Sequence, residues 1–301
     1  MKKIFLIAAA ALTLWACGSK ASESDPAIPG NSSSTEQPTK LNVMTFNIRY
    51  DNPDDLDNNW NFRKDRVANA IKFYDADIVG TQEVLKNQFD DLRQRLPDYT
   101  VIGVGREDGK EDGEYNALIF KKNRFNMIES GTFWLSETPD VEGSQGWDGA
   151  CKRIATWARL LDTASGKTVL ALNTHLDHVG RVARQEGVNL IFKKVTELSK
   201  GAPIIVTGDF NSTPDSDVVK HITNPSDADH LTDSKQLAKV VYGPDWSFHD
   251  FGEIPYNQRP LLDYVFIRGD MDVDRYGVLA ETENEQFLSD HAPVLVTLSL
   301  K

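Results

Sequence analysis

Cysteine is nearly absent from this sequence of 301 residues, which contains only Cys17 and Cys151. Two cysteines cannot build the disulfide framework of a small secreted domain, so stability must come from a packed core, in which we expect Cys151 to lie. The composition is 40% hydrophobic and 26% charged, as in ordinary globular proteins. The length is sufficient for one large domain or two smaller ones.

An excess of basic residues is also missing. Lys and Arg together number 33 against 45 Asp and Glu, which gives a formal net charge of -12. Proteins that bind by neutralising phosphates normally carry a basic excess, and the long-range attraction to a polyanion would be unfavourable here. The charge balance therefore argues against tight nucleic-acid binding, although it does not exclude a local basic groove.

The apolar run at the N-terminus is too short to span a membrane. Lys2 and Lys3 precede apolar residues 4–16, and Cys17 follows them, as in an export signal. The sequence Leu-Trp-Ala-Cys at 14–17 resembles the bacterial lipobox, which implies an exported lipoprotein of a Gram-negative bacterium, held at a periplasmic or outer membrane by lipid on Cys17. Trp15 stands where a small residue is usual, so a soluble secreted protein cleaved near Ala16 is the alternative.

The chain after the signal divides into a tether and one folded domain. Residues 19–40 are rich in Ser, Pro and small polar residues and cannot bury enough apolar surface to fold. We therefore expect a signal peptide at 1–16, a disordered tether at 17–40 and a folded domain at 41–301. No internal repeat and no further boundary is evident after Lys40.

The folded domain alternates short apolar strands with a few helices. Helices are predicted at 63–74 and 181–198, where apolar residues recur at helical spacing. Apolar strands are predicted at 41–48 and at the segment DIVGTQE, which ends in Glu83. Seven later segments are predicted as strands too: YTVIGVG, NALIF, IATWARLL, TVLALNTH, PIIVTG, DYVFI and APVLVTLSL. Because strands outnumber helices, the pattern favours an α/β fold of two packed sheets with helices outside over a simple doubly wound sheet.

The segment IIVTGDFNSTP, residues 204–214, ends an apolar strand in two polar side chains. Residues two apart in a strand point to the same face, so Asp209 and Asn211 would project together toward one ligand. Gly208 suggests a close backbone approach, and Pro214 cannot continue a central strand. A turn in which Asp209 merely closes the strand is the structural alternative.

Polar residues end or begin other apolar strands in the same way. Together with Asp209 and Asn211 they are Asn47, Glu83, Asn173, His175, Asp263, Asp290 and His291. Each has an ordinary structural explanation, but their recurrence matches a hard divalent cation with proton-transfer groups, because Mg²⁺ prefers oxygen ligands. Mn²⁺ is the expected substitute. The His-rich or Cys-rich spacing of zinc sites is missing, and so is a serine nucleophile in a G-x-S-x-G context.

The ordered series FNIRY, QE, NTH, GDFN, LDYVF and SDHAP resembles the endonuclease/exonuclease/phosphatase superfamily, which has the DNase I-like fold. The resemblance covers residue 41 to the C-terminus. The segments FNIRYDNPDD, FWLSETP, GWDGACKR and THLDH further resemble secreted or lipoprotein hydrolases of this superfamily from Bacteroidetes-type bacteria. The resemblance implies a four-layered α/β sandwich, a catalytic domain at 41–301 and an active site at the strand ends.

The resemblance also implies a metal site and a water site. Glu83 would be the principal Mg²⁺ ligand, assisted by Asn47 and Asp290. Asp209 and Asn211 would position the attacking water, with Asp209 as the candidate base. The cation would stabilise charge on the phosphoryl oxygens.

Two histidines receive roles from the same resemblance. Asp263 would hold His291, fix its tautomer and raise its pKa. His291 would then donate to the phosphate or assist the base. His175 would lie on the opposite side, where it would stabilise the phosphate or protonate the leaving group.

Further residues are candidates for substrate contact. Arg153, Tyr115 and Asn173 are the leading ones, and Arg153 lies just before a strand, where a guanidinium would face an anion. A second group has strong structural alternatives, as core residues or as the exposed face of a helix: Trp60, Trp147, His178, Arg181 and Arg184.

The expected activity is metal-dependent phosphoester hydrolysis outside the cytoplasm, by attack of a metal- and Asp-positioned water on phosphorus. The expected substrate is a small phosphorylated or phosphodiester metabolite, and a secreted nuclease acting on DNA or RNA is the alternative. A sphingomyelinase-like enzyme is disfavoured because no long hydrophobic hairpin is evident, and a catalytically inactive binding lipoprotein is disfavoured because every motif residue is intact. We expect a monomer, whose membrane contact is made by the lipid on Cys17.

Overall fold

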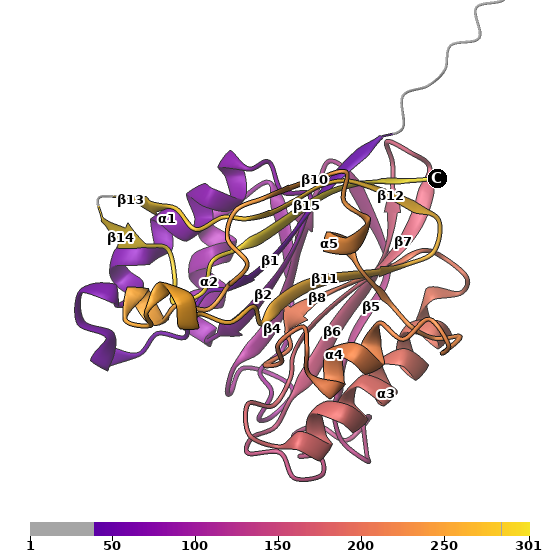
Figure 1. Cartoon of the computed structure of the whole chain (residues 1–301), viewed down its shortest axis with the longest axis horizontal. Helices are drawn as coiled ribbons and strands as arrows, with labels where there is room; N and C mark the ends of the chain where they lie inside the picture. The colour runs from indigo at the N-terminus through magenta and orange to yellow at the C-terminus, as the bar shows by residue number, and fades with distance from the viewer. Residues whose placement is uncertain (1–38, 284) are drawn as a thin grey trace, which may run out of the picture. The chain divides into compact units, whose positions relative to one another are not determined.

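Two β-sheets packed face to face, with helices on both outer faces, form the folded part of the chain (Figure 1). The computed structural model describes residues 39–283 and 285–301. The predicted signal peptide, Cys17 and nearly all of the predicted tether lie outside these residues. Among the residues described, none of the helices has the length and apolar character needed to cross a membrane.

The first sheet has seven strands in the order β10-β12-β15-β1-β2-β4-β3. Its central strands β1 and β2 are parallel, and β15 and β4 flank them in antiparallel register. The strands are β1 Lys40–Asn47, β2 Ile78–Val84, β3 Tyr99–Ile102, β4 Tyr115–Lys121, β10 Val240–Tyr242, β12 Met271–Val278 and β15 Val294–Leu300.

The second sheet has six strands in the order β5-β6-β7-β8-β11-β9 and repeats this plan. Parallel β7 and β8 lie at its centre, with antiparallel β6 and β11 beside them. The strands are β5 Phe125–Trp134, β6 Ile154–Asp162, β7 Lys167–His175, β8 Ile204–Asp209, β9 Thr232–Asp233 and β11 Asp263–Arg268. A short hairpin, β13 Thr282–Glu283 with β14 Gln286–Phe287, stands apart from both sheets.

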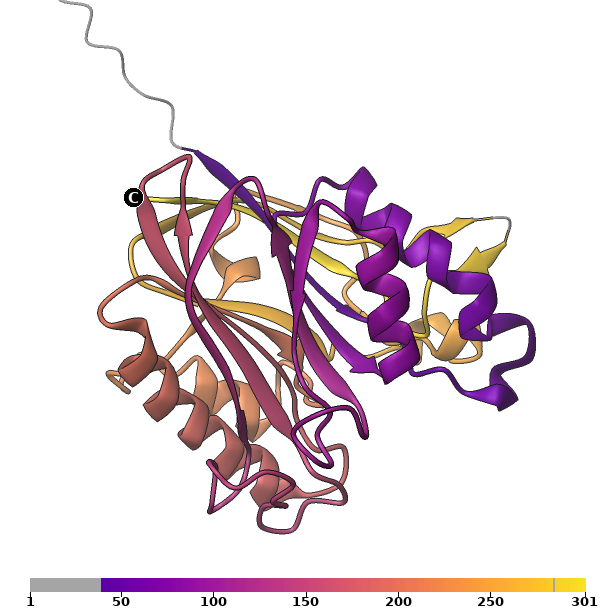
Figure 2. The ribbon, with the colours of Figure 1, turned by 180° about the vertical axis from the view of Figure 1, so that it is seen from behind.

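Helices cover the outer face of each sheet (Figures 1 and 2). Helices α1 (Trp60–Phe73) and α2 (Lys86–Arg95) cover the first sheet, and α3 (Arg181–Ser199) and α4 (Asp217–Ile222) cover the second. The remaining helices are short: α5 Ser234–Leu237, η1 Pro53–Asn58, η2 Asp250–Gly252 and η3 Tyr256–Gln258. The four layers are those expected from the sequence, and both long helices that were predicted are present.

Three apolar clusters hold the layers together. One lies between the sheets and includes Val43, Leu118 and Val265, while the other two lie under the helices of each face. The strands of the inner layers are therefore buried on both sides, which explains their nearly continuous apolar sequences. Gly80 of β2 faces the second sheet so closely that a Cβ atom there would collide with Asn173 and Thr207.

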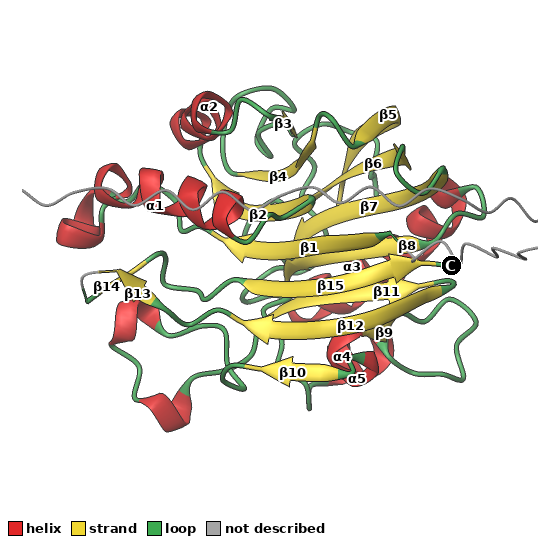
Figure 3. Ribbon diagram, turned by 90° about the horizontal axis from the view of Figure 1, so that it is seen from above, coloured by secondary structure: helices red, strands yellow, loops and turns green. Residues whose placement is uncertain are grey.

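All the chemically interesting strand ends lie at one edge of the sandwich. Strands β1, β2, β7 and β8 end there, and the antiparallel strands β4, β6, β11 and β15 begin there, as the registers and the view in Figure 3 agree. Gly208, just before the end of β8, lies against the carbonyl oxygen of Thr174, so a Cβ would not fit. This is the close backbone approach that the sequence suggested.

Candidate active site

A cavity of about 460 Å³ opens at this edge of the sandwich. Its walls come from both sheets and from the loops that follow or precede their strands. The ionisable residues that line it are Arg49, Tyr50, Glu83, Arg106, Glu114, Cys151, Arg153, His175, His178, Asp209, Asp250, Asp290 and His291. The cavity therefore gathers side chains that are distant in sequence, and most of the predicted site residues are among them.

Several of these residues have backbone conformations that are unusual for side chains other than glycine. Arg49, Glu83, Asn211 and Asp250 have φ angles of 59°, 62°, 46° and 50°. Such left-handed conformations cost free energy and tend to persist at functional sites, where the surrounding structure imposes them. Here each one turns the chain at the cavity, so that a side chain projects into it from the end of a strand or loop.

His291 lies between two carboxylates. Its Nδ1 is 2.7 Å from Asp263 Oδ2, and its Nε2 is 3.7 Å from Asp209 Oδ2. All three side chains are buried. Burial alone would lower the pKa of His291, but Asp263 and Asp209 outweigh it and hold that pKa well above its ordinary value. The two carboxylates therefore favour the imidazolium form of His291, in which Nδ1–H donates to Asp263.

Ser247 fixes the Asp263 carboxylate from behind. Its hydroxyl donates to Asp263 Oδ2 over 2.6 Å and accepts the backbone N–H groups of Leu262 and Asp263. Ser247 itself is fully buried. The Ser-Asp-His chain is thus oriented by backbone geometry, and the sequence analysis did not identify Ser247 because a lone serine in a loop carries no pattern.

Asp209 is a buried carboxylate whose two oxygens are held separately. Oδ1 accepts the N–H of Asn211 at 2.9 Å, and Oδ2 accepts the side-chain amide of Asn47 at 3.1 Å. Burial, with the nearby charge of Asp263, raises the pKa of Asp209 to about 7 even though His291 opposes the shift. A carboxylate tuned in this way is suited to accept a proton near neutral pH.

Asn211 and His175 form a pair next to Asp209. The Asn211 side-chain nitrogen lies 2.9 Å from both the Leu176 carbonyl oxygen and His175 Nε2. Because the carbonyl can only accept, this group is the NH₂, and His175 Nε2 must accept its second hydrogen. The proton of the neutral ring therefore lies on Nδ1, which has no hydrogen-bond partner among residues 39–283 and 285–301.

His175 is neutral for a physical reason. Burial, and then the positive charges of Arg153 and Arg106, lower its pKa well below the ordinary value. With Nε2 occupied by Asn211, the ring offers Nδ1–H as a hydrogen-bond donor. Of the two roles that the sequence left open for His175, this arrangement suits stabilising a phosphate better than protonating a leaving group.

An oxygen-rich group lies on the wall built by the first sheet. Glu83 accepts the Asn47 amide at Oε1 and the Tyr50 N–H at Oε2, and Asp290 faces the Arg49 guanidinium at 3.7 Å. Carboxylate oxygens are the ligands that hard divalent cations prefer, so Glu83 and Asp290 fit a Mg²⁺ or Mn²⁺ ion. The Asn47 side-chain oxygen instead accepts the Arg49 N–H, so its NH₂, not its oxygen, faces the acidic groups.

The atoms of Asp209, Asp263 and His291 also lie within 4.8 Å of one another, a spacing compatible with a metal ion. The His291 ring itself lies between the two carboxylates of this cluster, 2.7 Å from Asp263 and 3.7 Å from Asp209, so the space between them is already filled. Asp290 lies 3.7 Å from the Arg49 guanidinium, whereas the Glu83 carboxylate accepts hydrogen bonds from the neutral N–H groups of Asn47 and Tyr50. The carboxylate oxygens of the first-sheet wall are therefore donors of the kind that suits a divalent cation.

Residues 44–291 match the model of the Endonuclease/Exonuclease/phosphatase family. The chain belongs to this family. A crystal structure of the endonuclease/exonuclease/phosphatase from Bacteroides vulgatus is 47% identical, with a TM-score of 0.84 over 87% of this chain and 100% of that one. The mannosyl-6-phosphatase of Bacteroides thetaiotaomicron VPI-5482 is 34% identical, with a TM-score of 0.79 over 86% of this chain and 100% of that one.

A more distant relative is the 3'-5'-exoribonuclease subunit Ccr4 of Mycosarcoma maydis, 23% identical over 80% of this chain and 46% of that protein. The chain thus spans about half the length of this curated relative. The family is one of phosphoester hydrolases, and the buried Asp-His-Asp cluster beside an oxygen-rich wall has the groups that such an enzyme uses. The fold and the family assigned from the sequence are both confirmed.

Two of the predicted substrate contacts lie elsewhere. Asn173 is fully buried between the sheets, where its NH₂ donates to the carbonyls of Thr81 and Ala117 and its oxygen accepts from Gln82. Tyr115 is 2% exposed and its hydroxyl donates to the Lys110 carbonyl. Neither lines the cavity, so the structure corrects both predictions: Asn173 joins the sheets, and Tyr115 holds a loop.

The second group of candidates also divides into residues at the cavity and residues away from it. His178 lines the cavity, and Arg184 donates to the carbonyl of Asp177 at its rim. Trp60 is a core residue whose indole donates to Asp91. Trp147 packs beside the helix-covered core of the second sheet, and Arg181, 75% exposed in its side chain, pairs with Asp217.

Arg49, Arg106, Glu114 and Ser247 belong to the site but were not identified from the sequence. Arg49 could have been found, because it stands within the FNIRY motif and follows Asn47 by two residues. The pair Arg106 and Glu114 lies in a loop of Gly, Asp, Glu and Lys residues that resembles an ordinary charged turn. Only the folded chain brings this ion pair, 2.7 Å long, to the cavity.

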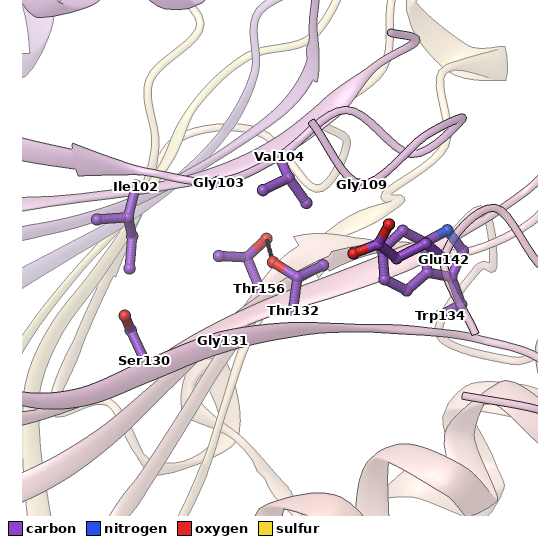
Figure 4. Close-up of a pocket in the computed structure, with 10 residues that line it drawn as sticks. All are labelled: Ile102, Gly103, Val104, Gly109, Ser130, Gly131, Thr132, Trp134, Glu142 and Thr156. Carbon is purple, nitrogen blue, oxygen red and sulfur yellow. Dashed lines mark hydrogen bonds between the residues drawn. The ribbon is translucent and has the colours of Figure 1, made fainter. Parts of the chain in front are cut away.

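A second cavity, of about 270 Å³, lies between the sheets near the edge strands β3 and β5 (Figure 4). Its lining is mostly small: Gly103, Gly131, Thr132 and Thr156 are among its residues, and the two threonine hydroxyls are 3.2 Å apart. Glu142 is its one ionisable side chain. A phosphoester would meet no cation there, so this cavity is not a second candidate for phosphate chemistry.

Proposed function

We propose that this protein is a metal-dependent phosphoester hydrolase in which a side-chain carboxylate activates water for attack on phosphorus. The observation that carries the proposal is the buried cluster of Asp209, His291 and Asp263 in the same cavity as Glu83 and Asp290. Phosphoryl transfer needs mainly positioning and charge stabilisation, and a covalent nucleophile is not required.

Glu83 and Asp290 are the residues that would hold the metal. Mg²⁺ is the ion that we propose, with Mn²⁺ as a substitute, because the donors are carboxylate oxygens. The bound ion would neutralise negative charge on the phosphoryl oxygens. Asn47, whose amide joins Glu83 to Asp209, would keep the metal-binding side and the water-binding side in a fixed relation.

Asp209 is the proposed general base. Its Oδ1 is fixed by the Asn211 N–H, and its raised pKa favours accepting a proton from the attacking water. His291, whose pKa is raised by Asp263 and Asp209, would donate its Nε2–H to the phosphoryl group, while Asp263 keeps the ring oriented. His175 would donate its Nδ1–H to another phosphoryl oxygen.

We propose a small phosphorylated metabolite as the substrate. The acidic composition disfavours a polyanion, and the similarity to a mannosyl-6-phosphatase supports a sugar phosphate or a comparably small ester. The relationship to an exoribonuclease keeps RNA or DNA as the second candidate. The sequence also supports export and attachment to a membrane by lipid on Cys17. Cell fractionation of the wild type and Cys17→Ser tests this. The wild type should be found in the membrane fraction with acyl mass on its N-terminal peptide, and Cys17→Ser should lose both.

The test is the hydrolysis of 4-nitrophenyl phosphate and bis(4-nitrophenyl) phosphate by purified protein, before and after dialysis against EDTA. We expect turnover of at least one ester, its loss after dialysis and its recovery with Mg²⁺ or Mn²⁺. A panel of sugar phosphates, phospholipids, RNA and DNA then identifies the substrate class. Absence of turnover on every ester with added metal would contradict the proposed function.

A further inference from the structure

Two arginines and a histidine line the cavity beside the Asp209 cluster, and the mechanism above gives them no contact with the phosphoryl group that is cleaved. They are Arg106, Arg153 and His178, which we call the arginine subsite. We propose that the arginine subsite binds a second anionic group of the substrate, a carboxylate or a phosphate, in addition to the phosphoester that is cleaved. The proposal rests on the proposed function, since it describes how that enzyme selects its substrate.

Arg153 is a buried cation with unused hydrogen-bond donors. It is 5% exposed, and its Nη2 lies 3.0 Å from His178 Nδ1. Its Nε and Nη1, and also Nε of Arg106, have no hydrogen-bond partner within the described part of the chain. Buried donors left without partners are costly and rare, and an anionic ligand that supplies the missing acceptors accounts for them.

The acids around the subsite do not supply these acceptors. Asp177 Oδ2 is 3.6 Å from Arg153 Nε, and the Asp177 carboxylate already accepts backbone N–H groups from the loops on both sides, including those of Ala150 and Gly180. Glu114 pairs with Nη1 of Arg106 at 2.7 Å, and Glu107 Oε1 lies 3.7 Å from the Arg106 Nε, too far to accept a hydrogen bond from it. The two guanidinium groups thus retain donors for a ligand.

The subsite is displaced from the place where water is activated. Arg153 precedes β6, His175 ends β7 and Asp209 ends β8, which are consecutive strands of one sheet. Neighbouring strands are about 4.8 Å apart, so roughly 10 Å of sheet separates the backbones of Arg153 and Asp209. The His175 ring lies 3.5 Å from Asp209, and the Arg153 guanidinium is held against the loop after β7. A phosphoryl group over Asp209 therefore lies two strands away from the backbone of Arg153, whose guanidinium faces His178 in the loop after β7.

The loop that carries Arg106 is fixed in place. The Trp134 indole N–H donates to the Arg106 carbonyl over 2.8 Å, and Figure 4 shows this tryptophan lining the neighbouring cavity. Lys152, next to Arg153, pairs with Glu107 at 2.6 Å and ties the two arginine-bearing segments together. A subsite held this way loses little conformational freedom on binding.

Two guanidinium groups are suited to a planar carboxylate or a phosphate, because each offers parallel N–H donors and a permanent charge. The predicted substrate class is therefore a small phosphoester that carries a further acidic group several ångströms from the scissile phosphorus. Esters with no acidic group other than the scissile phosphate, such as 4-nitrophenyl phosphate, would be hydrolysed without using the subsite.

The test uses inhibitors that cannot be hydrolysed. With 4-nitrophenyl phosphate or its diester as the reporter, inhibition constants are measured for phosphonoacetate, 3-phosphonopropionate and 4-phosphonobutyrate and for n-alkylphosphonates of the same lengths, at saturating metal. We expect the carboxylate to improve binding about tenfold or more at one of these lengths in the wild type. Arg153→Gln should remove this gain and leave the inhibition constant of the plain alkylphosphonate within about twofold.

Arg106→Gln provides a second variant that tests the same group from another loop, and its expected loss is in the same direction. Arg181→Gln is the matched control, because Arg181 is exposed outside the cavity and should change nothing. Equal binding of the two inhibitor series by the wild type overturns the proposal. So does an Arg153→Gln variant that binds both series equally weakly, since Arg153 would then contact the reacting phosphoryl group.

The experiments distinguish a failure of the proposed function from a failure of the arginine subsite. If the wild type hydrolyses no ester, the same inhibitors are compared by calorimetry with metal present, and tighter binding of the carboxylate series, lost in Arg153→Gln, would still support the subsite. Turnover with no advantage for the carboxylate would support the enzyme and reject the subsite.

Discussion

The cavity has two walls, one built on the first sheet and one on the second, and their ionisable side chains differ. The first presents Glu83 and Asp290, carboxylates that suit a divalent cation, with Arg49 as their neighbour. The second presents Asp209 and His175, whose pKa values are displaced in opposite directions by burial and by neighbouring charges. The sandwich therefore lets each wall be tuned separately, which one continuous sheet would make difficult.

Short contacts across the gap connect the two walls. Asn47 from the first sheet donates to Asp209 of the second over 3.1 Å, and His291, which precedes β15, donates to Asp263 of β11 over 2.7 Å. Because these links are side-chain contacts and not backbone pairing, point substitutions can break them without removing a strand. The comparison can thus be tested residue by residue.

The largest effect is expected on the second wall. Asp209→Asn and His291→Ala should each lower kcat by on the order of 10² to 10⁴, because each removes a positioned proton-transfer group. Initial rates with a saturating phosphoester, together with circular dichroism to verify folding, measure this loss. Near-normal rates in both folded variants would remove these residues from the mechanism.

A smaller effect on activity is expected when Asp263, the partner of His291 on the second wall, is replaced by a neutral residue. Asp263→Asn removes a negative charge that raises the pKa of both His291 and Asp209, so both pKa values should fall. Activity needs Asp209 deprotonated and His291 protonated, so both limits of the pH profile should move to lower pH by about one unit or more. The profile is measured at saturating metal for both proteins, and an unchanged profile would show that Asp263 does not tune the pair.

The smallest effect concerns stability at the cationic end of the second wall. Asp177 accepts backbone N–H groups from two loops, which lowers its pKa despite the opposing effect of burial. Its contribution is present above the unfolded pKa of about 3.9 and is lost as the pH falls through the lower folded pKa. Asp177→Asn should therefore cost about 1–3 kcal/mol of unfolding free energy at pH 7.

The matching measurement is urea unfolding at neutral and acidic pH. The difference between wild type and Asp177→Asn should shrink as the pH is lowered below about 4, since the wild type then loses the charged form too. A difference that stays constant down to the acid transition would mean that the carboxylate charge contributes nothing.

Much of the fold was accessible from the sequence because its inner strands are apolar on both faces. Strands β1, β2, β7, β8, β11 and β15 were all indicated by such runs. Helix α2 was missed because only three of its side chains are buried, Gln88, Phe89 and Leu92, so its apolar stripe is too thin to recognise. The edge strand β5 was missed because its middle is exposed and mixes polar with apolar residues, so it has neither an apolar run nor a regular alternation.

The site was partly accessible for a similar reason. Glu83, Asp209 and His291 can be recognised in the sequence because each is a polar residue at the end or the start of an apolar strand. Asn173 has the same kind of position but fills the space between the sheets, and no local pattern distinguishes an amide that joins two layers from one that faces a ligand. Asn211 fits both interpretations that the sequence left open. Its backbone N–H donates to Asp209 in the turn that closes β8, and its side chain pairs with His175 at the cavity.

The most direct test of the division between the two walls is the rate of phosphoester hydrolysis as a function of Mg²⁺ concentration in wild type, Glu83→Gln and Asp209→Asn. If the first wall holds the metal, Glu83→Gln should raise the half-saturating Mg²⁺ concentration by about 10-fold to 100-fold or more and recover much of its rate at high Mg²⁺. Asp209→Asn should keep the half-saturating concentration and lose the maximum rate. An unchanged Mg²⁺ requirement in Glu83→Gln, or full activity of the wild type without any divalent metal, would contradict the account.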